Sequence, residues 1–162
     1  MKKTIFRITL IGVLFLGLMI QMSTMVFATG KTLRQIVGEA KSQVTEVTVQ
    51  QIKTDIDSGK EFVLLDVRSP YDYEAGHLPK AVNIPRGDLE FSIGKLYPNK
   101  DAVMVLYCRL GGASALSAKT LMDMGYKNVK SLKGAFKVWG ESGYPIFNRL
   151  GEFKMIAFEK KE

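Results

Sequence analysis

Two short stretches of this chain, EFVLLDVRS (residues 61–69) and DAVMVLYC (residues 101–108), are apolar at consecutive rather than alternate positions. Strands of this kind are buried on both faces, which is typical of parallel sheets covered by helices. Helical periodicity alternates with such strands along the chain and is most regular in ASALSAKTLMDMGY (residues 113–126). This alternation predicts an α/β fold in which a central parallel sheet of about five strands has helices on both faces.

The remaining elements of the predicted sheet are shorter. We expect a strand near residues 46–47 and, after it, a helix that Thr48 caps and Gly59 ends. AVNIP (residues 81–85) and KNVKSL (residues 127–132) are two further strands, and GAFKVWGESGYP (residues 134–145) is a last helix that Gly143 and Pro145 end.

The N-terminal segment differs in character from the rest. Residues 1–28 contain three basic residues and no acidic one, then an apolar stretch, and they end in VFA, the small-residue pattern of a signal peptidase site. We expect a cleaved signal peptide, with an uncleaved membrane anchor as the alternative. Either interpretation places the domain outside the cytoplasm, in the periplasm or an equivalent compartment, and a membrane is a partner only if the segment is retained.

The residues after this segment divide into three parts. Residues 29–44 carry apolar side chains at helical spacing, which predicts a leading amphipathic helix. Residues 45–149 form the predicted α/β domain, and residues 150–162 form a C-terminal tail.

Charge and cysteine content exclude several classes of protein. The net charge is +7, and it falls to +4 if residues 1–28, with three of the 23 basic residues, are removed. The basic residues are dispersed, so we expect no nucleic-acid partner. A single cysteine forms no internal disulfide, and with a single histidine it makes no convincing zinc site, so we expect neither a metal nor an organic cofactor.

The cysteine, Cys108, lies in VLYCRLGGASALSAK (residues 105–119), directly after a predicted buried strand. Ligands of open α/β sheets bind beyond the carboxyl ends of the strands. Gly111 and Gly112 permit a turn whose N–H groups point inward, and a helix beginning near Ala113 or Ser114 adds its positive end. Such a loop favours the nucleophilic thiolate, although a lone cysteine after a core strand is also compatible with an inert buried thiol.

Three stretches in this order resemble the signatures of single-domain rhodaneses, which are sulfurtransferases. The stretches are LLDVRSPYDYEAGHLPKAVNIP (residues 64–85), VLYCRLGGASA (residues 105–115) and LKGAFKVWGESGYP (residues 132–145). The resemblance implies a rhodanese-like fold and a cysteine that carries a sulfane sulfur as a persulfide. The sulfur would pass from a donor such as thiosulfate to a thiophilic acceptor, cyanide or a thiol.

Carried over onto this chain, the resemblance makes Cys108 the nucleophile. The backbone amides of the loop would hold the transferred sulfur and any oxyanion, and the residues implied are Arg109, Leu110, Gly111, Gly112, Ala113 and Ser114. Asp66 and Arg68 follow a core strand and either pair with each other or, in the favoured interpretation, brace neighbouring loops; in a further interpretation Arg68 faces the mouth of the site. His77 is a general base in one interpretation and a structural residue in the favoured one.

Ala113 departs from the pattern, because many family members have an arginine there. The absence of this arginine, together with the apolar Leu110, predicts weaker use of thiosulfate as a donor. The alternative function is a non-catalytic binding or sulfur-relay module. A phosphatase of the related Cys-x5-Arg type needs an arginine at position 114, where this chain has serine.

Overall fold

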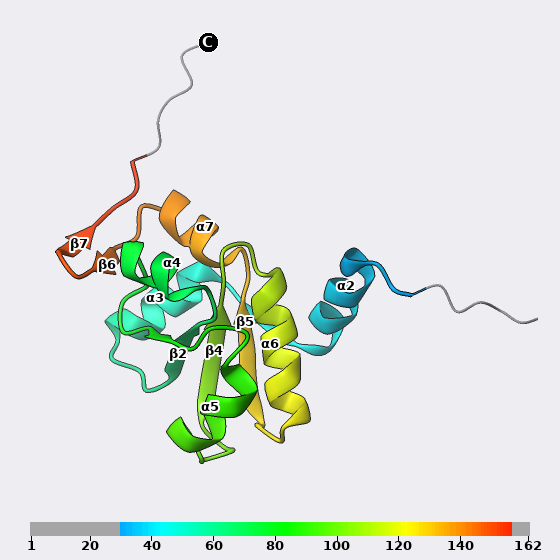
Figure 1. The fold of residues 1–162 in the computed structure, drawn as a ribbon. Coiled ribbons are helices and arrows are strands. Elements are labelled where there is room, and N and C mark those ends of the chain that lie inside the picture. The colour runs from blue at the N-terminus through cyan, green and yellow to red at the C-terminus, as the bar shows by residue number, and fades with distance from the viewer. Residues whose placement is uncertain (1–29, 157–162) are drawn as a thin grey trace, which may run out of the picture. The chain divides into compact units, whose positions relative to one another are not determined.

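The computed structural model describes residues 30–156, so the predicted signal peptide or anchor lies outside the described residues. From Thr32 onward the described residues belong to one compact unit. Five strands form one sheet in the order β1-β5-β4-β2-β3, and every neighbouring pair is parallel (Figure 1). The strands are β1 (Thr45–Val47), β2 (Val63–Asp66), β3 (Val82–Asn83), β4 (Val103–Tyr107) and β5 (Asn128–Leu132). The predicted five-stranded parallel sheet is therefore confirmed.

Helices cover both faces of this sheet, as predicted (Figure 1). They are α2 (Leu33–Gln43), α3 (Val49–Asp57), α4 (Pro70–Ala75), α5 (Leu89–Leu96), α6 (Gly112–Asp123) and α7 (Ala135–Glu141). One apolar cluster contains residues of α5 and α6, and the other contains residues of α3 and α7. In β4, Met104 and Leu106 belong to the first cluster while Val105 and Tyr107 belong to the second. The strand is buried on both faces, which explains its uninterrupted apolar sequence.

Local signals account for where several helices begin. The Thr48 hydroxyl accepts a hydrogen bond from the Gln51 N–H, which caps α3 as predicted. Thr32 and Gln35 form a capping box at the start of α2. In α4, Ser69 caps the helix and Pro70 is its first residue. From the sequence, Pro70 indicates only the end of the preceding strand, and helices α4 and α5 are not predicted.

The C-terminal part contains a hairpin that the sequence did not predict. β6 (Ile146–Asn148) and β7 (Gly151–Phe153) form an antiparallel hairpin that crosses the boundary expected between residues 149 and 150. The Asn148 side chain accepts a hydrogen bond from the Leu150 N–H across the turn. Gly76 lies so close to Phe153 that a Cβ atom at position 76 would be 2.9 Å from the ring. The hairpin is thereby packed against the domain.

Connections leave the centre of the sheet in opposite directions. The chain passes from β2 to β3 on one side and from β4 to β5 on the other, so the switch point lies between β2 and β4. Ligands of doubly wound sheets bind at the carboxyl ends of the strands at this point. Cys108 follows β4 and Arg68 follows β2 closely, so the fold places both residues there. Among the helices at residues 30–156, none is both long and apolar enough to cross a membrane.

Candidate active site

Cys108 lies one residue beyond β4, and it is 6% exposed. Its Sγ accepts a hydrogen bond from the Gly111 N–H at 3.1 Å. Gly111 has φ +92° and caps α6, a backbone conformation that side chains with a Cβ resist. The helix begins at Gly112, one or two residues earlier than predicted. The sulfur is therefore held by the turn that starts the helix.

The first turn of α6 supplies further hydrogen-bond donors. The N–H groups of Gly112, Ala113 and Ser114 have no carbonyl acceptor within the helix because they belong to its first turn. These donors and the helix dipole favour negative charge near the N-terminus of α6. A loop of this kind suits a thiolate or an anion bound beside it.

Helix α7 anchors the Cys108 loop from another side. The N–H of Phe136 donates to the Cys108 carbonyl at 3.0 Å, and the N–H of Lys137 donates to the Arg109 carbonyl at 3.1 Å. These N–H groups belong to the first turn of α7, and the bonds satisfy donors that have no partner within that helix. The loop conformation consequently depends on where α7 begins.

A cavity of about 370 Å³ opens beside the cysteine. It brings together most of the residues that the sequence predicted for the site, and it is lined by Val67, Arg68, Asp72, Cys108, Arg109, Leu110, Gly112 and Ala113. Gly111 is not in the lining; it is buried, and its N–H donates the hydrogen bond to the Cys108 sulfur. The Ser114 hydroxyl is also buried, 3.0 Å from the Ser131 hydroxyl in β5, so only the main chain of Ser114 remains available to a ligand.

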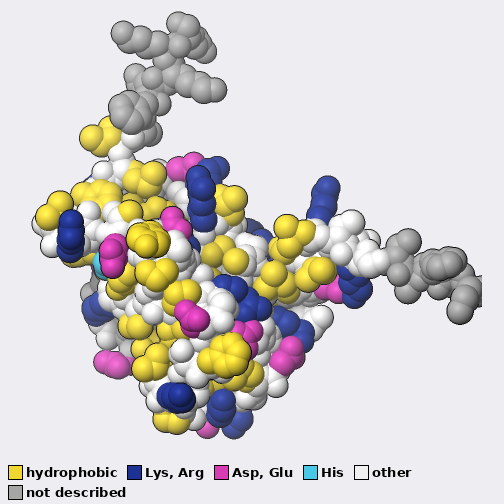
Figure 2. Space-filling view, in the orientation of Figure 1, with side chains coloured by type: hydrophobic (Ala, Val, Ile, Leu, Met, Phe, Trp, Pro, Cys, Tyr) yellow, Lys and Arg dark blue, Asp and Glu magenta, His cyan; other side chains and the backbone are white. Residues whose placement is uncertain are grey.

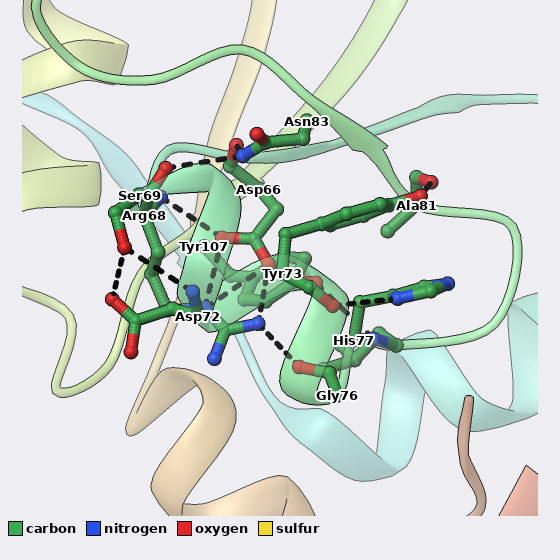
Figure 3. Close-up of polar contacts among 11 residues, drawn as sticks. Asp66, Arg68, Ser69, Asp72, Tyr73, Gly76, His77, Ala81, Asn83 and Tyr107 are labelled. Atoms are coloured by element: carbon green, nitrogen blue, oxygen red, sulfur yellow. Dashed lines mark hydrogen bonds and ion pairs between the residues drawn. The ribbon is translucent and has the colours of Figure 1, made fainter. Parts of the chain in front are cut away.

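Arg68 lies along the wall of this cavity, but its guanidinium is already engaged. Its Nε is 3.0 Å from both Asp66 carboxylate oxygens, and a terminal nitrogen donates to the Gly76 carbonyl at 2.7 Å (Figure 3). The guanidinium carbon lies 4.1 Å from the centre of the Phe136 ring. Burial disfavours the cation, but the hydrogen bonds and charge of Asp66 outweigh it and raise the pKa of Arg68. Arg68 therefore pairs with Asp66, one of the interpretations that the sequence offered, and its bond to Gly76 also braces the neighbouring loop.

Tyr107 completes this buried polar cluster, and the sequence analysis did not identify its part in it. Its hydroxyl accepts a hydrogen bond from the Leu78 N–H at 3.1 Å and bonds to the Asp66 side chain. Burial, and then the charge of Asp66, raise the pKa of Tyr107 well above its usual value. The signal was not available in the sequence, because only the sheet register places Tyr107 beside Asp66.

His77 lies outside the cysteine cavity. Its Nδ1 is 2.9 Å from the Tyr73 carbonyl oxygen, and its ring stacks on the Tyr73 ring with 3.9 Å between centroids (Figure 3). Its main chain pairs with Phe147, in strand β6 of the C-terminal hairpin. These contacts agree with the structural interpretation of His77.

Asp72 is a cavity residue that the sequence analysis did not select. It belongs to the first turn of α4, where its carboxylate accepts a hydrogen bond from the Ser69 hydroxyl at 2.7 Å. The Ser69-Pro70 helix start is the sequence signal that could have identified Asp72, because it places Asp72 in the first turn of α4, which follows β2 closely. Within residues 30–156, no three His, Cys, Asp or Glu side chains are grouped so that they could hold a metal ion.

The fold and the site define a class: an α/β domain whose single cysteine is mounted at a sheet switch point on a donor-rich loop. A model of the rhodanese-like domain matches residues 48–142, and the chain therefore belongs to the rhodanese-like domain family. A sulfurtransferase from Allochromatium vinosum is 27% identical over 103 residues, which are 64% of this chain and 94% of that protein.

Two further proteins are similar to this chain. YrkF from Bacillus subtilis, named as a candidate sulfur carrier protein, is 30% identical over 101 residues, and the match covers 62% of this chain but only 54% of that protein. The solved structure of a Rhodopseudomonas palustris protein of unknown function, described as a candidate tyrosine phosphatase, has a TM-score of 0.69 and 32% identity. That likeness covers 76% of this chain and 99% of the other. The names of the sulfurtransferase and the sulfur carrier support sulfur transfer in general.

Proposed function

We propose that this protein is a sulfurtransferase that moves a sulfane sulfur from a donor such as thiosulfate to cyanide or a thiol through a Cys108 persulfide. The observation that carries the proposal is the setting of the Cys108 sulfur. Its Sγ already accepts the Gly111 N–H, and the first turn of α6 offers donors beside it. These groups stabilise negative charge on the thiolate and on the terminal sulfur of a persulfide.

The proposed reaction has two transfers. With thiosulfate, the Cys108 thiolate attacks the sulfane sulfur, the sulfur–sulfur bond of the donor breaks, and sulfite leaves with the electron pair. Cyanide or a thiolate then attacks the terminal sulfur of the persulfide. The bond from that sulfur to Sγ breaks, and its electron pair returns to Cys108 as thiolate. No external oxidant or reductant is needed.

The rim of the cavity bears on which donor is preferred. Ala113 contributes no charge to the lining, and Leu110 adds an apolar side chain that is 62% exposed. Arg109 is a cationic residue in the lining, whereas the Arg68 guanidinium is paired with Asp66. We therefore expect thiosulfate to be a modest donor for this enzyme, because a small dianion gains little from such a rim.

Cys108→Ser is the first test. The variant should lose sulfur transfer from thiosulfate to cyanide, and mass spectrometry should find one added sulfur on the wild-type protein only. Ser117→Ala is a matched control in α6, because the Ser117 hydroxyl is buried, has no hydrogen-bond partner among the described residues and is not in the cavity lining. Full activity in Cys108→Ser, or no added sulfur from any of several donors, would contradict the proposal.

A sulfur-relay module without turnover of its own is the second candidate. Ala113 and the likeness to a protein named as a sulfur carrier favour it. The same experiment separates the two functions, because a relay module would accept one sulfur on Cys108 yet would not turn over with cyanide or simple thiols. We also propose that the domain acts outside the cytoplasm, on the strength of the N-terminal sequence.

A further inference from the structure

A second cavity, of about 510 Å³, lies next to the cysteine cavity and shares Leu110 with it. It is formed where α2, the start of α3 and the turn between β5 and α7 meet the Cys108 loop. Its lining residues are Lys41, Thr48, Val49, Gln50, Leu110, Lys133, Gly134 and Val138. A molecule lying across Leu110 would therefore touch both cavities.

The charge in this second cavity is positive. Lys41 and Lys133 line it, and none of its lining residues within the described range 30–156 is acidic. The Lys41 ammonium lies 3.3 Å from a carboxylate oxygen of Glu46, while Lys133 has no ion pair with a described residue. These three side chains together carry one net positive charge. The cavity accordingly favours an anionic ligand group.

Lys41 also lies close to the active-site loop. Its Nζ is 3.7 Å from the position that a Cβ atom on Gly111 would occupy, and Gly111 is the residue whose N–H is bonded to the Cys108 sulfur. Lys41 belongs to α2, outside the family match at residues 48–142. The leading helix thus brings a cation to a loop that has alanine at position 113.

Besides the two lysines, the lining of the second cavity contains the polar Thr48 and Gln50 and several apolar side chains. Val49 and Val138 line the second cavity, and the exposed Leu110 side chain separates it from the cysteine. Thiosulfate and cyanide are small ions whose charge remains next to their reacting sulfur or carbon. They would not place a charge beside Lys41 and Lys133 while reacting at Cys108.

We propose that Lys41 and Lys133 form a subsite for the carboxylate of an organic thiol, which accepts the sulfur from Cys108. This inference rests on the proposed function and adds a substrate class to it. The acceptor thiolate attacks the terminal sulfur of the persulfide, a new sulfur–sulfur bond forms on the acceptor, and Cys108 leaves as thiolate. The methylene chain of the acceptor lies against Leu110, and its carboxylate reaches the two ammonium groups.

The test is a single-turnover discharge of preloaded Cys108 persulfide in the intact protein. The acceptors are ω-mercapto carboxylic acids of increasing chain length, each paired with the ω-mercapto alcohol of equal length. We expect the acid to discharge the persulfide about threefold faster than the alcohol at the chain length that spans both cavities, a size typical of partly exposed ion pairs. The preference should shrink at high salt, which screens such pairs.

Matched variants identify the charges responsible. Lys133→Gln and Lys41→Gln should each lower the acid-to-alcohol rate ratio, whereas Glu46→Gln should raise it by removing the competing carboxylate. Lys127→Gln is the control, because Lys127 precedes β5 while Lys133 follows it, at the opposite end of the same strand. Each ratio is measured within one variant, so a partial loss of stability affects both acceptors alike.

The outcomes separate this inference from the proposed function. Discharge at equal rates by acid and alcohol at every length, or a ratio that Lys133→Gln and Lys41→Gln leave unchanged, would overturn the subsite alone. Failure to load Cys108 from any donor would overturn the proposed function, and this inference with it. A ratio lowered equally by Lys127→Gln would assign the preference to net charge and would also overturn the subsite.

Discussion

Ala113 lies at the mouth of the cysteine cavity, exposed, in the first turn of α6. Ala113→Arg would add a guanidinium to the same cavity lining as Arg109, where thiosulfate would approach Cys108 in the proposed reaction. We expect the KM for thiosulfate to fall by roughly threefold with a smaller change in kcat, because an exposed ionic contact contributes about 0.2–1 kcal/mol. Steady-state kinetics with Ala113→Gln as an uncharged control measures this. An unchanged or higher KM in the arginine variant would show that this rim does not bind the donor.

The buried Tyr107 hydroxyl contributes to the free energy of unfolding. Tyr107→Phe should lower the free energy of unfolding by about 1–3 kcal/mol, because the Leu78 N–H and the Asp66 carboxylate lose a buried partner. Urea denaturation measures the change. Tyr71→Phe is the control, since Tyr71 is 85% exposed and should tolerate the loss of its hydroxyl.

The raised pKa of Tyr107 also fixes the pH dependence of this effect. A folded-state pKa above the unfolded value of about 10 means that the native state holds the proton more tightly. The contribution to stability is complete below about pH 10 and is lost as the pH rises above it. Wild-type protein should therefore lose more stability between about pH 8 and about pH 11 than Tyr107→Phe does. Equal losses would contradict this assignment.

At the scale of elements, the start of α7 holds the Cys108 loop through two backbone hydrogen bonds. Gly134 has φ +72°, and a Cβ atom there would lie 2.2 Å from a Val138 methyl group. Gly134→Ala should cost about 2–5 kcal/mol, from the left-handed backbone and the clash together, and should lower sulfur transfer by displacing the bonds from α7 to Cys108 and Arg109. Gly125→Ala is matched, since Gly125 has φ +89° with open space around it.

Comparison of Gly134→Ala with Gly125→Ala separates the effect of backbone strain from the effect of displacing the Cys108 loop. Gly125→Ala should cost only about 1–2 kcal/mol, the penalty for a side chain in the left-handed region, and should keep its activity. Thermal unfolding and the thiosulfate assay measure both quantities. If Gly134→Ala retained full activity in its folded state, the loop would not depend on the position of α7.

Sequence reasoning predicted the elements whose signals are local. The buried strands β2 and β4, the Thr48 cap and the glycine turn before α6 are all encoded within a few residues. Helix α4 was missed because Ser69-Pro70 is compatible with both a strand end and a helix start. The pairing of β6 with β7 was missed because it depends on a turn with little apolar pattern around it.

For the candidate site as well, only the features encoded by neighbouring residues could be predicted. Cys108 and its loop could be identified because strand, glycines and helix follow one another in sequence. The cluster of Asp66, Arg68 and Tyr107 was only partly visible, since Tyr107 reaches it through the register of β2 on β4. The second cavity was not visible at all, because Lys41, Leu110 and Lys133 are brought together by three separate elements.

At the scale of the whole molecule, export is the property that the N-terminal sequence predicts. Expressed in full in an export-competent bacterial host, the protein should be recovered outside the cytoplasm beginning at Thr29, and intact mass measures this directly. Ala28→Trp should block cleavage, because signal peptidase sites require small residues. Full-length wild-type protein confined to the cytoplasm would contradict the prediction.

The strand β1 pairs with β5, so Thr45 lies beside Lys130, roughly 85 residues further along the chain. Contacts between such distant partners form slowly because bringing the two ends together costs loop-closure entropy before the contact contributes any stability. A polypeptide is synthesised from its N-terminus, so Cys108 emerges before β5 and before the N–H groups of α7 that hold its loop. Four of the five sheet strands precede Cys108, so most of the sheet is synthesised before the thiol, and only β5 and α7, which follow it, complete the surroundings of its loop.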